Sequence, residues 1–299
     1  METGFNADMD DDILIVGVDS LIGSALVERA TERGIKWTGT SRRREHEREN
    51  IVFLDLAREE SVDGFFVPAR VAYFCAAATN LRQCEEDFPG TYQINVEQTF
   101  RLAKNLAARG TALVFLSTNL VFDGSGPRMG VDAPVAPQTA YGRQKAGMEK
   151  LLRNEFEKVA IMRLTKVVHP RMPLFQKWLA DLRAGMTISP VSDLVFSPVD
   201  LSLVTGELLA MATVFRSGIY QLSGDQDLSY WEAARLLANT LGLDSKKIAP
   251  KTCAEAGLSV RNSPYTTLEY RSPGLSGVAP ASTSTLEAIF REMSSVPNQ

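Results

Sequence analysis

The sequence predicts an α/β fold in which a doubly wound parallel sheet carries helices on both faces and is joined to a smaller C-terminal lobe. Three observations support this prediction. Short continuous apolar runs, typical of buried parallel strands, alternate with longer segments of helical periodicity. A glycine-containing turn separates the first apolar run from the first helical segment. The regular alternation ends near Leu164, and the elements beyond it are shorter and less regular.

The elements before Leu164 follow one another in a strand-helix order. The apolar runs predicted as strands are residues 13–16, 36–40, 51–54, 71–75, 112–116 and 159–164. The segments predicted as helices are residues 21–33, 88–109 and 138–155. Gly34 and Gly110 follow two of these helices, as expected for residues that end a helix.

The C-terminal half predicts a second, discontinuous lobe. Helices are expected over 174–184, 200–215 and 229–241, with short strands near 188 and 194–196. Asp200 is a predicted N-cap, Ser229 and Glu232 have capping-box spacing, and residues 218–222 are predicted to return as an edge strand of the main sheet. The predicted dinucleotide-binding domain comprises 12–164 and 197–224, the substrate-binding lobe comprises 165–196 and 225–292, and 1–11 and 293–299 are predicted as tails.

Composition narrows the class of protein. The chain of 299 residues is 44% hydrophobic and 23% charged, as in ordinary globular proteins, and its net charge of −4 argues against nucleic-acid or anionic-membrane partners. Its three cysteines (Cys75, Cys84 and Cys253) lack metal-like spacing and predict reduced thiols. Two histidines cannot build a histidine-rich metal site, so we expect no metal. Residues 1–12 are acidic and lack the apolar core of a signal peptide, so we expect a cytoplasmic protein.

The glycine turn lies directly between the first predicted strand and helix. Gly17 and Gly23 allow a tight turn that brings backbone amides against a pyrophosphate at the helix N-terminus. Such a turn predicts a Rossmann-type dinucleotide site, although an ordinary strand-helix turn is the simpler alternative. Ser20 stands where this class of turn usually has a glycine, and its side chain could crowd the phosphate or donate a hydrogen bond to it.

The end of the second predicted strand favours NADP(H), with NAD(H) as the alternative. Ser41, Arg42 and Arg43 follow this strand, and no acidic residue occurs where an acceptor for a ribose 2′-hydroxyl is expected. Arginine there can pair with a 2′-phosphate. The alternative is a solvated charged loop, because acidic residues alternate with basic ones from 45 to 49.

Tyr141 and Lys145 are the candidate catalytic pair. Four residues apart on a predicted helix, they face the same side. The ordinary pKa of tyrosine is about 10, and a nearby ammonium is expected to lower it toward the working range. Thr118, just past the fifth predicted strand, can hold a substrate oxygen on which charge develops. A solvated helix face is the simpler interpretation of an isolated pair.

These motifs together resemble the extended short-chain dehydrogenases/reductases, and most closely the dTDP-4-dehydrorhamnose reductase branch of sugar nucleotide-binding proteins. The resemblance covers about residues 12–245. The segments that carry it are residues 17–23 (GVDSLIG), 55–56 (DL), 76–79 (AAAT), Asn95, 117–124 (STNLVFDG), 141–145 (YGRQK) with Glu149, 193–198 (DLVFSP) and 218–224 (GIYQLSG).

The resemblance implies a role for each matching residue. Tyr141 would protonate the substrate carbonyl oxygen, Thr118 would hydrogen-bond that oxygen, and Lys145 would lower the pKa of Tyr141 and hold the nicotinamide ribose. The implied cofactor-binding residues are Gly17, Ser20, Leu21, Ile22, Gly23, Ser41, Arg42, Arg43, Asp55, Leu56, Ala76, Ala77, Ala78, Tyr141 and Lys145. The implied substrate-binding residues are Thr79, Arg82, Ser117, Thr118, Asn119 and His169.

Departures from the family pattern restrict the predicted chemistry. Asn119 and Leu120 replace the usual aspartate and tyrosine, so the two acids that related dehydratases use for water elimination are missing. Arg82 replaces a frequent aspartate and could meet a substrate anion or simply be exposed, and His169 replaces a glycine as a structural or pocket-lining residue. The prediction is therefore an NAD(P)H-dependent reductase of a keto group on a nucleotide-linked deoxysugar. Alternatives are a catalytically silent NADP-binding regulatory subunit of another enzyme and a nucleotide-sugar epimerase. Relatives commonly form homodimers, although no interface can be identified in the sequence.

Overall fold

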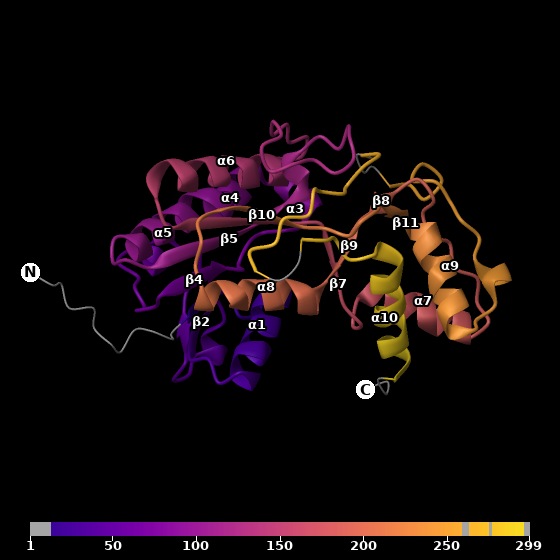
Figure 1. The fold of residues 1–299 in the computed structure, drawn as a ribbon, viewed down its shortest axis with the longest axis horizontal. Helices are drawn as coiled ribbons and strands as arrows, with labels where there is room; N and C mark the ends of the chain where they lie inside the picture. Colours follow the sequence, from indigo (N-terminus) through magenta and orange to yellow (C-terminus); the bar gives the residue numbers. More distant parts are fainter. Residues whose placement is uncertain (1–12, 259–262, 275–276, 296–299) are drawn as a thin grey trace, which may run out of the picture.

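The computed structural model describes residues 13–258, 263–274 and 277–295, and its centre is a seven-stranded parallel sheet (Figure 1). The strand order is β10-β6-β5-β4-β1-β2-β3. The strands are β1 (Ile13–Val16), β2 (Trp37–Ser41), β3 (Ile51–Phe53), β4 (Val71–Phe74), β5 (Ala112–Thr118), β6 (Val159–Leu164) and β10 (Gly218–Leu222). The strand order reverses between β1 and β4, and ligands of such sheets bind at the carboxyl ends beside this reversal.

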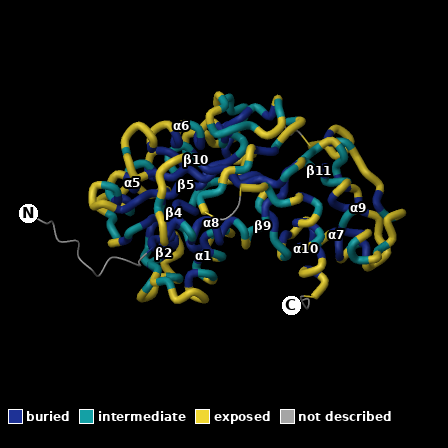
Figure 2. Tube along the Cα trace, in the orientation of Figure 1, coloured by how far each residue is buried: buried dark blue, intermediate teal, exposed yellow. Residues whose placement is uncertain are grey.

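Helices cover both faces of the sheet, which confirms the predicted fold class (Figure 1). On one face, α1 (Leu21–Glu32) and α8 (Leu201–Thr213) pack together over an apolar core that includes Ile15 and Leu208. On the other face, α5 (Thr99–Ala107) and α6 (Ala140–Glu155) cover a second core. Figure 2 shows the strands as the most buried part of the chain, as expected for a sheet covered on both sides.

The six predicted strands before Leu164 all form, and residues 218–222 return as edge strand β10 beside β6, as predicted. The predicted helix over 88–109 is a continuous run with a π-helical interior. It comprises α4 (Phe88–Tyr92), the π segment η3 (Gln93–Gln98) and α5. π segments inside α-helices are rare and are found frequently at functional sites.

Several short elements were not expected from the sequence. They include α2 (Glu59–Val62), α3 (Leu81–Glu86), the short helical turns η2 (Arg44–His46), η4 (Asn119–Val121) and η5 (Ser245–Lys247), and the paired strands β7 (Lys166–Val168) and β9 (Pro198–Asp200). Most hold loops at the carboxyl end of the sheet, where apolar periodicity gives little signal. The strand β11 (Leu228–Ser229) and the longer helix α10 (Ser282–Ser295) in the C-terminal lobe were not expected either.

The C-terminal lobe is built around a third apolar core formed by three helices (Figure 1). The helices are α7 (Pro173–Arg183), α9 (Tyr230–Leu241) and α10 (Ser282–Ser295), and the small strands β8 (Val195–Phe196) and β11 (Leu228–Ser229) pair beside them. Because α10 runs through Ser295 and buries Met293, residues 293–295 are helical rather than part of the tail predicted over 293–299. The predicted tail over 1–11 and residues 296–299 lie outside the described residues.

The predicted helix caps are present. The Asp200 carboxylate accepts a hydrogen bond from the Ser202 amide at the start of α8. Ser229 and Glu232 form the reciprocal capping box at the start of α9. Each cap satisfies backbone amides that have no acceptor within the helix, which fixes where the helix begins.

Candidate active site

The glycine turn between β1 and α1 is closely packed at both of its glycines. Gly17 has a φ of +92°, and a Cβ atom there would lie 2.7 Å from the Cβ of Ala76, which follows β4. A Cβ at Gly23 would lie 2.1 Å from the Gly17 carbonyl oxygen. Both positions therefore require glycine, and the turn exposes backbone at the strand-order reversal, where a pyrophosphate can approach the N-terminus of α1.

Ser20 caps helix α1. Its hydroxyl oxygen accepts a hydrogen bond from the Gly23 amide at 3.0 Å and donates to the Gly17 carbonyl at 2.8 Å. The side chain is therefore engaged within the turn. Leu21 and Ile22 occupy the first turn of the helix, whose amides lack intrahelical acceptors and so are suited to an anion.

The residues expected on the adenosine side gather at the carboxyl ends of β2, β3 and β4. Arg42 and Arg43 are exposed, directly after Ser41. Asp55 contacts Arg58 at 3.3 Å, and Leu56 beside it is buried.

Asn95, in the π segment η3, hydrogen-bonds the backbone at the end of the segment from Ala76 to Ala78. The Asn95 side chain accepts from the Ala78 amide at 2.8 Å and donates to the Ala78 carbonyl at 2.9 Å. It also donates to Gln144 on α6 at 2.7 Å. One buried amide thus couples the predicted cofactor segment to the helix that carries Tyr141.

The structure corrects the expectation that no acidic group lies at the end of β2. The Asp19 carboxylate, from the glycine turn, accepts a 2.5 Å hydrogen bond from Ser41 and lies 2.7 Å from Nδ1 of His46. The contact links residues 22 positions apart, so sequence reasoning confined to the end of the second strand missed it.

The candidate catalytic side chains lie on two elements that pack against each other, Thr118 at the end of β5 and the other two on α6. Tyr141 and Lys145 lie in the first two turns of α6, whose N-cap is Thr139. The Lys145 ammonium lies 5.7 Å from the centre of the Tyr141 ring and donates to the Leu116 carbonyl at 2.8 Å. The Thr118 hydroxyl oxygen accepts from the Leu120 amide at 3.2 Å.

The pKa values differ from the expectation that Lys145 lowers the pKa of Tyr141. Burial raises the pKa of the Tyr141 phenol well above its ordinary value, and nearby Cys84 adds to the rise. Burial lowers the pKa of Lys145 to about 8, against opposing contributions from Glu149 and the Cys75 and Cys84 thiols. Burial is the main cause of the Tyr141 shift, and the Lys145 ammonium donates its hydrogen bond to the Leu116 carbonyl. A raised pKa favours the protonated phenol, the form that can donate a proton.

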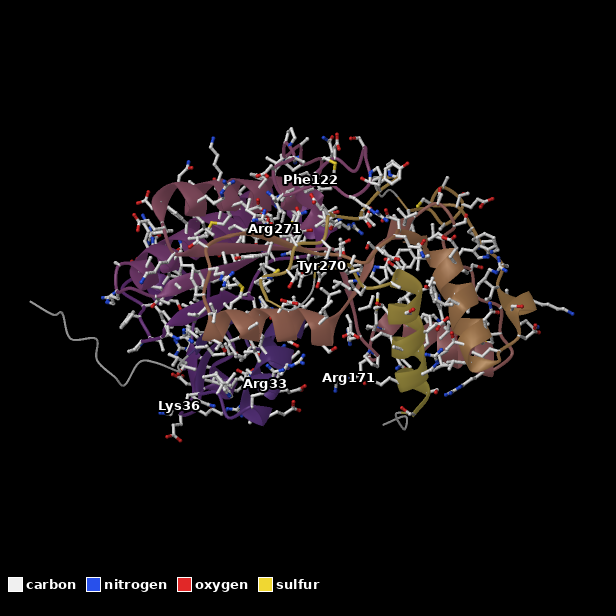
Figure 3. The ribbon with its side chains drawn as sticks, in the orientation of Figure 1. Arg33, Lys36, Phe122, Arg171, Tyr270 and Arg271 are labelled. Carbon is white, nitrogen blue, oxygen red and sulfur yellow. The ribbon has the colours of Figure 1, made fainter. Side chains whose placement is uncertain are left out.

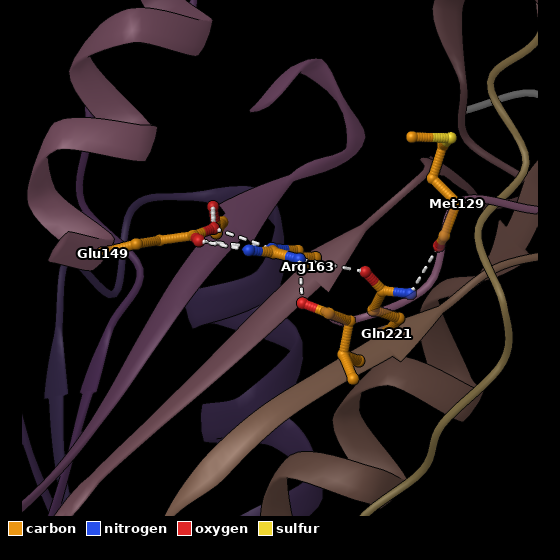
Figure 4. Close-up of polar contacts among 6 residues, drawn as sticks. Met129, Glu149, Arg163 and Gln221 are labelled. Carbon is orange, nitrogen blue, oxygen red and sulfur yellow. Dashed lines mark hydrogen bonds and ion pairs between the residues drawn. The ribbon is translucent and has the colours of Figure 1, made fainter. Parts of the chain in front are cut away.

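A buried ion pair joins helix α6 to strand β6 (Figure 4). The Arg163 guanidinium on β6 contacts the Glu149 carboxylate on α6, with the shortest distance 2.7 Å and side chains only 2% and 4% exposed. Arg163 also donates to the Gln221 side chain on β10 at 3.2 Å, and Gln221 donates to the Met129 carbonyl at 2.9 Å. The network thus ties the catalytic helix, two strands and the loop after β5 together.

The predicted substrate-binding residues differ in their surroundings. The Ser117 hydroxyl donates to the buried Glu149, so its side chain belongs to the hydrogen-bond network of Glu149 and Arg163. Arg82 is 84% exposed and pairs with Glu86 on α3, so it faces solvent. Thr79 is exposed just before α3. His169, after β7, is half-buried, and burial with neighbouring Arg171 and Lys166 lowers its pKa.

A small open pocket lies between the loop after β5 and a segment from the C-terminal part of the chain. Its lining includes Asn119, Leu120 and Phe122 on one side and residues 263 and 265–268 on the other. Asp227 holds Thr266 and Thr267 by hydrogen bonds from their hydroxyls. Residues 263–268 were not predicted as part of a pocket because this segment lacks apolar periodicity.

Next to this wall, the chain crosses back over the sheet domain. Figure 3 shows Tyr270 and Arg271 in the middle of the view, below Phe122, and the Arg271 and Gln221 backbones exchange hydrogen bonds of 2.9 Å. The C-terminal segment therefore reaches the main sheet beside the candidate site as well as forming α10.

Neither a metal site nor a membrane-spanning helix is found among the described residues. Among them, no group of three or more His, Cys, Asp or Glu side chains is arranged to hold a metal ion. In the same part of the chain, no helix is long and apolar enough to cross a membrane.

Comparisons with known proteins point to one family. The model described as "RmlD substrate binding domain" matches residues 11–291. The chain is 25% identical over 276 residues to the spore coat polysaccharide biosynthesis protein SpsK of Bacillus subtilis, covering 90% of this chain and 92% of that protein. It is 27% identical over 214 residues to a dTDP-4-dehydrorhamnose reductase of Mycobacterium tuberculosis, covering 69% and 70%.

Two further similarities concern a subunit and a solved structure. The chain is 25% identical over 262 residues to methionine adenosyltransferase 2 subunit beta of Xenopus tropicalis, covering 83% of this chain and 77% of that protein. The crystal structure of a dTDP-4-dehydrorhamnose reductase from Bacillus anthracis in complex with NADP superposes with a TM-score of 0.82 at 20% identity. That superposition covers 95% of this chain and 100% of the other.

Proposed function

Because the chain belongs to the RmlD substrate binding domain family, we propose that it is an NADP(H)-preferring reductase of a keto group on a nucleotide-linked deoxysugar. The observation that carries the proposal is the packing of α6, which carries Tyr141 and Lys145, against β5, which ends at Thr118, together with a turn that accepts only glycine at two positions. Relatives that match the chain are named as reductases of a 4-keto deoxysugar nucleotide.

The residues present fit a dinucleotide. A Cβ at Gly17 would clash with Ala76 and a Cβ at Gly23 with the Gly17 carbonyl, so both glycines are needed for the tight turn that brings backbone amides to a phosphate. The first-turn amides of α1 would hold the pyrophosphate, while Arg42 and Arg43 would meet a 2′-phosphate and Ser41 the ribose. When bound, the reduced nicotinamide supplies a hydride to the substrate carbonyl carbon.

Tyr141 is the proposed proton donor. Its raised pKa keeps the phenol protonated, so it can deliver a proton to the carbonyl oxygen as negative charge develops there. The Thr118 hydroxyl would hydrogen-bond the same oxygen and stabilise that charge. Lys145, charged below its pKa of about 8, would then stabilise the tyrosinate left behind and bind the ribose of the cofactor.

The loop after β5 favours reduction over dehydration. Water elimination needs an acid and a base beside the sugar ring, and Asn119 and Leu120 provide neither. Both line the small pocket at the loop after β5. We also propose that the lobe formed by residues 165–196 and 225–292 supplies most sugar-nucleotide contacts. The three cysteines are free and buried, which supports a reducing cytoplasmic compartment.

The proposal is tested with the purified wild-type protein and Lys145→Met. NADPH oxidation is followed at 340 nm against a panel of 4-keto deoxysugar nucleotides, and thermal shift with NADP(H) measures binding separately. Turnover of at least one keto sugar by the wild type, lost in Lys145→Met, supports the proposal. Thermal stabilisation by NADPH without turnover of any substrate in the panel would contradict it.

One observation favours a second candidate function. The chain resembles the beta subunit of a methionine adenosyltransferase over most of its length, so a dinucleotide-binding regulatory subunit is the alternative. Stoichiometric co-purification with another enzyme, with no NADPH oxidation on any keto sugar, would establish that alternative over reductase activity.

A further inference from the structure

Asp19 is held rigidly between two segments of the chain. One carboxylate oxygen accepts from the Ser41 hydroxyl at 2.5 Å, and the other lies 2.7 Å from Nδ1 of His46 in η2. The Ser41 oxygen in turn accepts from the Arg43 amide at 3.0 Å. The carboxylate therefore has a fixed orientation at the carboxyl end of β2, although its own residue belongs to the turn after β1.

Its charge is present at neutral pH. Partial burial acts to raise the pKa of Asp19, but hydrogen bonds from Ser41 and His46 and the charges of His46 and Arg43 together lower it below its ordinary value. The side chain is 25% exposed, so its negative charge can act on a ligand bound beside it.

The carboxyl end of β2 is where Rossmann-type sites distinguish NAD from NADP. In Rossmann-type sites, the group at the end of the second strand meets the adenosine ribose, where an acidic residue accepts the 2′-hydroxyl and a basic residue pairs with a 2′-phosphate. Here both kinds of group are present. Arg42 and Arg43 are exposed, and in the described part of the chain neither makes an ion pair within 4 Å, while Asp19 supplies a fixed negative charge.

We propose that Asp19 sets the cofactor choice by opposing the 2′-phosphate of NADPH and accepting the 2′-hydroxyl of NADH, so that it weakens the NADP preference that Arg42 and Arg43 create. Specificity is a difference between two affinities, and a repulsive group changes it as effectively as an attractive one. Ser41 and His46 are positioning residues that hold the carboxylate. The inference rests on the proposed function only in requiring that the chain binds a dinucleotide.

The test measures the dissociation constants of NADPH and NADH by fluorescence titration, for the wild type and Asp19→Asn. The amide keeps the shape and an acceptor oxygen but removes the charge. We expect the ratio of the NADH to the NADPH constant to rise roughly tenfold, mostly through tighter NADPH binding, and the change to shrink at high salt because it is electrostatic.

Two control variants separate charge at this place from other effects. Glu28→Gln removes an exposed negative charge from α1 and is expected to leave the ratio unchanged. Arg43→Ala is expected to lower the ratio by weakening NADPH selectively. It provides a second readout of the same charge balance if Asp19→Asn melts at a much lower temperature than the wild type.

The outcomes are distinguishable. An unchanged ratio in Asp19→Asn, or an equal loss for both cofactors, would overturn the role of Asp19 while leaving dinucleotide binding intact. Failure of the wild type to bind either cofactor would overturn the proposed function and this inference together.

Discussion

Removing one member of the buried Arg163–Glu149 pair should destabilise the protein strongly. Their side chains are 2% and 4% exposed, and the guanidinium makes nitrogen–oxygen contacts of 2.7, 3.1 and 3.2 Å with the carboxylate. Glu149→Leu would leave a buried guanidinium without its counter-charge and would also remove the acceptor of the Ser117 hydroxyl. Breaking such a pair from one side typically costs about 3–5 kcal/mol, because an uncompensated charge stays buried.

The loss should be measured by urea unfolding followed by tryptophan fluorescence, with the melting temperature as a second readout. For a chain of this size, about 3–5 kcal/mol corresponds to a decrease of roughly 5–15 °C. The double variant Glu149→Leu with Arg163→Met removes both charges, so its loss should be smaller than the sum of the single losses by about 1–3 kcal/mol. Arg291→Ala, which breaks an exposed pair with Glu287 on α10, is the matched control and should change stability by less than about 0.5 kcal/mol.

Two results would refute this reasoning. One is a single Glu149 or Arg163 variant that loses less stability than the Arg291 control. The other is a double variant whose loss equals the sum of the single losses, since independent sites add and coupled sites do not.

Three other predictions concern the turn and the catalytic lysine. The ammonium of Lys145 has a pKa of about 8, so kcat/KM for reduction should fall as the pH rises through that value. A pH profile that stays flat to about pH 10 would exclude an essential ammonium. Gly23→Ala would force a Cβ to within 2.1 Å of the Gly17 carbonyl, so NADPH affinity should fall at least tenfold by titration, and an unchanged affinity would show that the turn can move aside. Ser20→Ala removes the N-cap of α1 and should cost about 1 kcal/mol in urea unfolding, whereas a gain in stability would contradict the capping role.

Much of the fold follows from local sequence signals. The buried strands are continuous apolar runs, and the caps at Asp200 and Ser229 are set by residues no more than three positions apart. The glycine turn was predictable for the same reason, because its two glycines and the adjacent strand lie within one short segment.

The details of the site depend on contacts that local signals do not encode. Asp19 reaches Ser41 only because β1 and β2 are neighbours in the sheet, so the acidic group at that place was not found from the sequence. Ser117 and Arg82 have side chains suited to a substrate, yet one turns inward to Glu149 and the other outward to Glu86. Motif position predicted where these residues lie along the chain but not the direction of their side chains.

The pKa of Tyr141 could not be predicted from the sequence either. Spacing on a helix predicts that Tyr141 and Lys145 share a face, and the structure confirms this, with the ammonium 5.7 Å from the ring centre. Spacing does not predict that the Leu116 carbonyl accepts from the ammonium or that burial raises the pKa of the phenol. Those effects follow from the packing of β5 against α6.

The most direct test of the account is the rate of NADPH oxidation by Tyr141→Phe with a 4-keto deoxysugar nucleotide that the wild type reduces. Phenylalanine keeps the ring and removes only the proton donor, so kcat should fall by about 10²–10⁴-fold while the dissociation constant of NADPH stays within about threefold of the wild-type value. Full turnover by Tyr141→Phe would contradict the assignment of Tyr141 as the proton donor.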